Sequence, residues 1–141
     1  MNSTYELILS GLGHGLPLLL LDFVVTLVLL GIGIAIYMAI TPFNERELLA
    51  RGNAAAGLVL AGSVVSLAIP LAATLATSSA LLDIVIWGVI ALILQLVTFG
   101  LVTLCIRDLR HQIDAGSVAA ACPLVAAQIA IALLNAAAVA G

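Results

Sequence analysis

The sequence predicts an all-α polytopic membrane protein with four transmembrane helices, and two observations carry this prediction. First, hydrophobic residues make up 65% of the 141 residues and charged residues only 8%. A soluble domain is about half apolar and a quarter charged, so the mean hydropathy of +1.36 is typical of a chain dissolved in lipid. Second, the apolar residues form four stretches long enough to cross the ~30 Å hydrocarbon core as helices. We expect a single membrane domain over residues 1–141.

The first span is preceded by residues 1–16, which are mixed in polarity. Three glycines between positions 11 and 15 argue against a rigid helix there, so we expect an interfacial lead-in. The first span then covers residues 17–40, with Pro17 in the first turn, where its missing N–H costs nothing. The other three spans are predicted at residues 54–76, 81–105 and 118–139, with a polar turn at 77–79 and a kink at Pro70.

A charged stretch separates the first two spans. Asn44 and Glu47 have the spacing of a capping box, which predicts that a helical turn starts at Asn44. Gly52-Asn53 follows, and Asn53 is a plausible N-cap for the second span. The alternative is one continuous helix from Glu45 whose first turns project into water, and the sequence leaves both open.

All four Arg residues lie in two charged turns, and the chain contains no Lys. The positive-inside rule therefore predicts that both turns are cytoplasmic and that both termini lie outside the cytoplasm. We expect the charged residues of these turns to form a docking surface for a cytoplasmic partner: Glu45, Arg46, Glu47, Arg51, Arg107 and Arg110.

The two halves of the chain resemble each other. Leu20–Val24 matches Leu81–Val85, including an Asp in each, and the break at Gly52-Asn53 matches Gly116-Ser117. Ser117 is thereby predicted to cap the fourth span. Two spans per half give both halves the same orientation, so we expect two parallel two-helix repeats, about residues 17–76 and 81–139.

Polar side chains inside the spans are the candidates for chemistry. Asp22 and Asp83 are predicted near outer helix N-termini, either as interfacial acids or as a paired cation or proton site. Gln95 and Gln128 are predicted at mid-membrane depth on adjacent helices. They either bond the helices together or line a permeation path, and both interpretations stay open.

Several motifs resemble the bacterial inner-membrane family known as domain of unknown function 350, the YjfL-like proteins. The resemblance is carried by Pro42-x-Asn44-Glu45, Arg51-Gly52-Asn53-Ala54-Ala55-Ala56, Asp83 followed by Trp87-Gly88, Gln95, and Gly116-Ser117-x-Ala119-Ala120. It implies an inner-membrane protein with four helices in two repeats and no agreed activity. It also suggests a cytoplasmic partner similar to the phage-shock-A membrane-remodelling proteins.

Several function classes are disfavoured by what the chain lacks. Four Arg residues are too few to form a basic patch that binds nucleic acid. The chain also contains no set of nucleophile, base and acid of the kind that would indicate an enzyme. Cys105, Cys122 and His111 are too few ligands for a metal site, and we expect no cofactor. The sequence therefore favours a structural or interaction subunit of the bacterial inner membrane, with a homo-oligomer allowed. The alternative is a small oligomeric channel or transporter for ions, protons or small solutes that uses the intramembrane Asp and Gln residues.

Overall fold

The computed structural model describes residues 2–78 and 80–141, so Ser79 of the predicted polar turn lies outside the described residues. Every regular element in the described chain is a helix: α1 (Asn2–Ile40), α2 (Glu45–Ala50), α3 (Ala54–Thr77), α4 (Leu81–Cys105), α5 (Leu109–Asp114) and α6 (Val118–Ala140). Four of these helices, α1, α3, α4 and α6, are long and apolar enough to cross a membrane. The predicted all-α fold with four membrane-length helices is confirmed.

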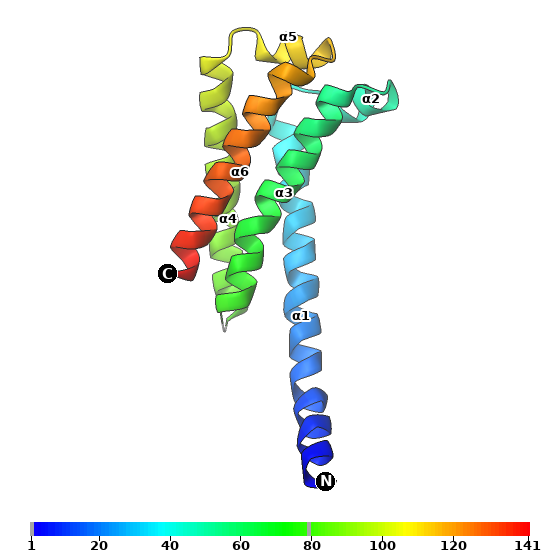
Figure 1. Cartoon of the computed structure of the whole chain (residues 1–141), viewed down its shortest axis with the longest axis vertical. Helices are drawn as coiled ribbons and strands as arrows, with labels where there is room; N and C mark the ends of the chain where they lie inside the picture. Colours follow the sequence, from blue (N-terminus) through cyan, green and yellow to red (C-terminus); the bar gives the residue numbers. More distant parts are fainter. Residues whose placement is uncertain (1, 79) are drawn as a thin grey trace.

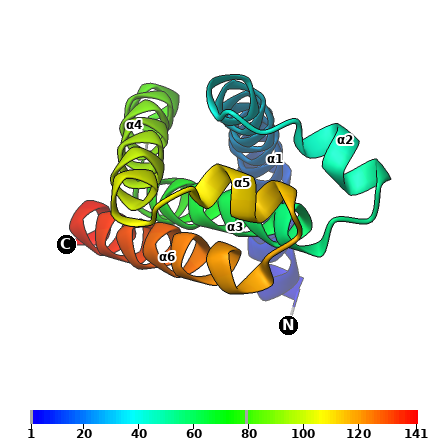
Figure 2. The ribbon, with the colours of Figure 1, turned by 90° about the horizontal axis from the view of Figure 1, so that it is seen from above.

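The four long helices form a bundle around α3, which packs most extensively on α6 and also contacts α4 and α1 (Figure 1). The short helices α2 and α5 lie at the same end of the bundle, with α5 over α3 and α2 projecting to the side, as Figure 2 shows from above. The turn between α3 and α4 and the end of α6 lie toward the opposite end. We call the end formed by residues 44–53 and 107–116 the charged end.

Helix α1 differs from the prediction at its start. It is continuous from Asn2 to Ile40, with Pro17 inside it, so the predicted non-helical lead-in and the predicted start at Pro17 are both wrong. Each Gly costs only about 1 kcal/mol relative to Ala in a helix, whereas unpaired backbone groups cost several kcal/mol each in an apolar setting. Backbone pairing therefore outweighs the local signals, and Pro17 removes only the N–H that would bond the Gly13 carbonyl.

Both breaks before α3 and α6 form as predicted. The Asn53 side chain accepts a hydrogen bond from the Ala56 N–H at 3.0 Å, and the Ser117 hydroxyl accepts one from Ala120 at 3.3 Å. The glycine before each cap has a positive φ, +74° and +87°, a conformation that other residues rarely adopt. The interrupted helix is therefore correct and the continuous one is wrong. Both halves share this local pattern, and the duplication itself stays a prediction.

The hydrophobic core lies toward the charged end. Phe99 of α4 packs edge-on against Tyr37 of α1 and against Phe43, with ring centroids 6.0 and 5.7 Å apart. Leu109 and Ile113 of α5 are fully buried against the same cluster. Because these apolar contacts join α5 to the bundle, the charged end is a fixed part of the fold.

The contact between α3 and α6 depends on a small residue. A Cβ added at Gly62 would lie 2.7 Å and 2.8 Å from the two γ-methyl groups of Val125, closer than real side chains approach. Close backbone approach of this kind is how membrane helices gain van der Waals packing without a hydrophobic driving force. It also brings the polar side chains of α3 within reach of those on α6.

Candidate functional site

Five buried polar residues from all four long helices meet inside the bundle, and we call them the polar cluster: Tyr37, Ser63, Ser66, Gln95 and Gln128. Gln128 of α6 is its centre. Its Nε2 donates to the Tyr37 hydroxyl at 2.6 Å and approaches the Ser63 hydroxyl oxygen at 3.4 Å. The amide of one helix therefore joins two others.

Gln95 of α4 makes the second set of interhelical bonds. Its Nε2 donates to the backbone carbonyl of Gln128 at 3.2 Å and to that of Ser66 at 3.4 Å. The Ser66 carbonyl needs a partner because Pro70, four residues later in α3, has no N–H to donate to it. The carbonyl that Pro70 leaves unpaired in α3 is thus bonded by an amide side chain from α4.

Each glutamine nevertheless keeps one polar atom without a partner. Gln95 Oε1 and Gln128 Oε1 are buried and accept no hydrogen bond within the described chain. Gln95 is 1% exposed and Gln128 is 0% exposed. An unpaired carbonyl in a non-aqueous interior is costly, so these two oxygens are the acceptors in the cluster that remain open to a donor or a cation.

The polar cluster continues toward the charged end through α1. Thr41 lies one turn after Tyr37, and its hydroxyl lies 2.9 Å from both the Tyr37 carbonyl and Glu45 Oε1. Glu45, which the sequence places in the docking surface, is only 3% exposed. It is the first residue of α2, and α2 packs on α3, which turns this carboxylate inward. Its buried carboxylate is therefore not available to a docking partner.

The two intramembrane acids occupy different settings. Asp83 lies in the first turn of α4, as predicted, and its side chain is exposed. Asp22 lies well inside α1, which begins at Asn2, so its predicted place near a helix N-terminus is wrong. The Asp22 carbonyl accepts a hydrogen bond from the Thr26 hydroxyl at 2.7 Å. No hydrogen bond or ion pair within residues 2–78 and 80–141 joins Asp22 to Asp83.

The charged end contains a polar pocket built from both charged turns. It measures about 270 Å³, and its polar lining comes from Asn44, Glu47 and Arg51 on one turn and from Arg110 and Asp114 on the other. The pocket therefore brings together side chains that lie about sixty residues apart in the chain. We call it the two-turn pocket.

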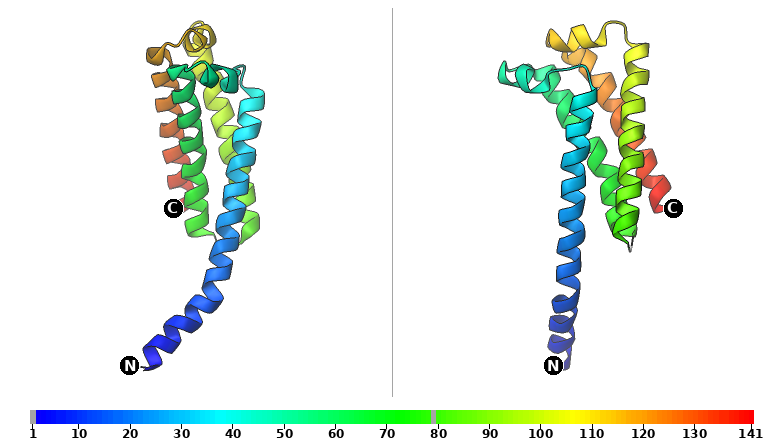
Figure 3. Two further views of the ribbon diagram at one scale, coloured as in Figure 1. Left: turned by 90° about the vertical axis from the view of Figure 1, so that its right-hand side faces the viewer. Right: turned by 180° about the vertical axis from the view of Figure 1, so that it is seen from behind.

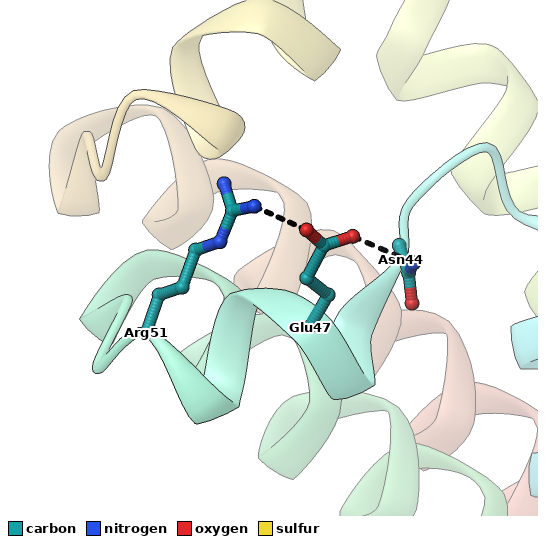
Figure 4. A network of polar contacts seen from close by, with 3 residues as sticks. All are labelled: Asn44, Glu47 and Arg51. Carbon is teal, nitrogen blue, oxygen red and sulfur yellow. Dashed lines mark hydrogen bonds and ion pairs between the residues drawn. The ribbon is translucent and has the colours of Figure 1, made fainter.

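Ion pairs order the walls of the two-turn pocket. Glu47 bonds Arg51 with one carboxylate oxygen and accepts from Asn44 Nδ2 with the other at 2.9 Å (Figure 4). Asn44 is the N-cap residue directly before α2, at the predicted position, but its side chain bonds the Glu47 carboxylate and makes no capping bond to the backbone of α2, so the predicted capping box does not form. On the opposite wall, Arg110 Nε lies 3.9 Å from Asp114 Oδ2. Both pairs are half-exposed, so each contributes at most about 1 kcal/mol.

Asn53 links the two charged turns, which are distant in sequence. Besides capping α3, its Nδ2 donates to the carbonyls of Ile113 and Asp114 at 2.9 and 3.1 Å. These carbonyls belong to the end of α5, and the Ile113 carbonyl also accepts a hydrogen bond from the Gly116 N–H at 2.9 Å. The residue predicted only as a helix break therefore also holds the pocket together, whereas its counterpart Ser117 caps α6 through Ala120.

The remaining predicted residues are exposed. Arg46, Arg107, Cys105 and Cys122 lie on the surface of the isolated chain, and Arg107 is only 3.9 Å from Asp108 Oδ2. Within the part of the chain that the structure describes, no three His, Cys, Asp or Glu residues form a potential metal site. Sequence reasoning missed Tyr37, Ser63 and Ser66 as partners of the glutamines; their polar groups inside apolar spans were the available signal.

The fold and its buried polar groups define a multi-span α-helical membrane protein, with lipid around the bundle. The chain belongs to the family described as Domain of Unknown Function (DUF350), whose model matches residues 11–139. Over 102 residues it is 35% identical to the UPF0719 inner membrane protein YjfL of Escherichia coli K12, and to that of strain O157:H7. Each alignment covers 72% of this chain and 77% of the relative. No solved structure gives a significant match.

Proposed function

We propose that this protein is a structural or interaction subunit of the bacterial inner membrane that binds a cytoplasmic protein at its charged end. The observation that carries the proposal is the two-turn pocket, which exists only because both charged turns fold together. Its Arg and acidic side chains suit a partner surface of mixed charge. A phage-shock-A-like protein, suggested by the family resemblance, is the candidate partner.

The rigidity of the charged end supports this proposal. Asn53 bonds the end of α5, and the buried Leu109 and Ile113 fix α5 on the bundle. A binding site held in place before association loses less conformational entropy on binding. The same proposal includes the orientation, since all four Arg residues lie at this end and the positive-inside rule puts them in the cytoplasm.

The test removes charge from the pocket while keeping enough Arg to hold the topology. The double variant Arg51→Ala/Arg110→Ala removes one Arg from each wall of the pocket. The matched control Arg46→Ala/Arg107→Ala removes the same charge from the same turns, outside the pocket lining. With both proteins in nanodiscs, we expect the pocket variant to lose binding of the candidate partner by at least tenfold and the control to retain it. Equal binding by both variants contradicts the proposal.

A second candidate function is transport of a small cation or proton, and the unpartnered oxygens of Gln95 and Gln128 favour it. In this proposal those oxygens accept the permeating species, and Asp22 and Asp83 attract it from the opposite end of the bundle. Reconstituted protein should then pass ions or protons, alone or as a homo-oligomer. Gln128→Leu should abolish the flux, and Asp22→Asn/Asp83→Asn should reduce it. Liposomes with the protein that leak no faster than empty liposomes, across several ions, contradict this function.

A further inference from the structure

Helix α1 is longer than the membrane requires. It contains 39 residues, whereas α3, α4 and α6 contain 24, 25 and 23. At 1.5 Å per residue α1 measures about 58 Å, against a hydrocarbon core of about 30 Å. Figure 1 shows that the excess lies at the N-terminal side, where α1 runs beyond the turn between α3 and α4. This part of the helix therefore has no helical neighbour from the bundle.

The N-terminal part of α1 also changes direction below the bundle, and seen from above it passes beneath α3 and α6 (Figure 2). The left view of Figure 3 shows the first turns of α1 curving off the direction of the rest of the helix. Pro17 lies inside the helix and cannot bond the Gly13 carbonyl, and missing bonds of this kind are the usual cause of a bend. A Cβ added at any of the glycines 11, 13 and 15 would meet no atom within 4 Å, so nothing packs there to straighten the helix.

Residues 2–16, which we call the N-terminal segment, carry an apolar stripe along one helix face. Tyr5, Ile8, Leu9, Leu12 and Leu16 follow the spacing that places side chains on one helix face, and each is between 49% and 67% exposed. Glu6 and Ser10 fall on the opposite face by the same spacing. A helix with this pattern suits a boundary between an apolar phase and water.

We propose that the N-terminal segment lies along the membrane surface at the end opposite the charged end, with a lipid interface as its partner. The segment is continuous with the rest of α1, and the bend turns it off the direction of that part of the helix. Tyr5 provides an aromatic ring with a polar tip, which is favoured at the interface. Glu6 is the only charged side chain in the segment, so apolar burial, and not attraction to anionic lipid, holds it there.

The experiment places an environment-sensitive fluorophore on each face of the segment. Cys105→Ala/Cys122→Ala removes both free thiols, and single cysteines are then introduced as Leu12→Cys and Ser10→Cys. Leu101→Cys, on an exposed position of α4, gives the reference for a lipid-facing site in a spanning helix. The labelled proteins are reconstituted in vesicles of phosphatidylethanolamine and phosphatidylglycerol. Quenching is measured with iodide in water and with lipids that carry a nitroxide at a shallow or a deep acyl position.

We expect the Leu12→Cys label to be blue-shifted, quenched more by the shallow nitroxide than by the deep one, and protected from iodide. The Ser10→Cys label should be quenched by iodide more strongly than the Leu12→Cys label. Iodide quenching of both labels to the same degree would place the segment in water and overturn the proposal. Deep-nitroxide quenching of both, as at Leu101→Cys, would make it a spanning continuation and overturn it too. Protection of Leu12→Cys without lipid quenching, together with disulfide-linked copies of the unlabelled protein, would assign the stripe to a second chain and equally overturn it.

Discussion

The substitution Gly62→Ala tests the close contact between α3 and α6 on which the polar cluster depends. The new Cβ would lie 2.7 and 2.8 Å from the γ-methyl groups of Val125 and 3.1 Å from its Cβ. Val is branched at Cβ and has little rotamer freedom in a helix, so the two backbones must separate. Overpacking of this kind costs about 1–3 kcal/mol, which at 1.4 kcal/mol per tenfold lowers the folding equilibrium constant by about 5- to 150-fold. The intrinsic gain from replacing Gly by Ala in a helix, about 0.5–1 kcal/mol, offsets part of this cost.

The assay is SDS-driven unfolding in mixed micelles, followed by far-UV circular dichroism. Gly100→Ala is the matched control, because a Cβ there meets no atom within 4 Å, and its unfolding midpoint should not fall. The reasoning also predicts rescue: in a Val125→Ala background, Gly62→Ala should lose most of its destabilising effect. A Gly62→Ala midpoint equal to that of Gly100→Ala, or the absence of coupling with Val125→Ala, would refute the packing argument.

The remaining predictions use the same unfolding assay. Asn53→Ala should destabilise the protein by about 0.5–2 kcal/mol through the lost cap, and more than Ser117→Ala does, because Asn53 also bonds two carbonyls of α5; equal effects of the two would contradict this cross-turn role. Tyr37→Phe should cost about 0.6–1.7 kcal/mol, since the ring contact with Phe99 remains and the hydroxyl that accepts from Gln128 is lost. In a Gln128→Leu background Tyr37→Phe should be close to neutral, and an undiminished effect there would assign the loss to something other than this bond.

Local sequence signals predicted the secondary structure correctly where residues close together in the chain determine it. Composition and stretch length gave four membrane helices, because crossing lipid requires about twenty apolar residues with internally paired backbones. The Gly52-Asn53 and Gly116-Ser117 breaks gave helix starts, because a positive φ and a side-chain cap act within four residues. Counting along each span also singled out Gln95 and Gln128, and both are buried in the bundle; their depth in the membrane stays a prediction.

The same local signals failed at the start of α1. The glycines weaken a helix by only about 1 kcal/mol each, and Pro17 removes one hydrogen bond, so together they bend α1 without ending it. This error also misplaced Asp22, whose predicted helix N-terminus lies far from the actual start at Asn2.

By itself, the sequence determined that the helices lie in a membrane, how many membrane-length helices there are and where the helix breaks fall. It also determined that all Arg residues cluster in two turns. These features follow from composition and from residues close together in the chain. Only the tertiary structure decided which polar groups meet. It joined Gln128 to Tyr37, supplied Gln95 to the carbonyl freed by Pro70, and buried Glu45 where α2 packs on the bundle. These contacts depend on how closely the helices approach and how each is rotated. In lipid, both are set by small residues such as Gly62 and by the geometry of the bundle as a whole.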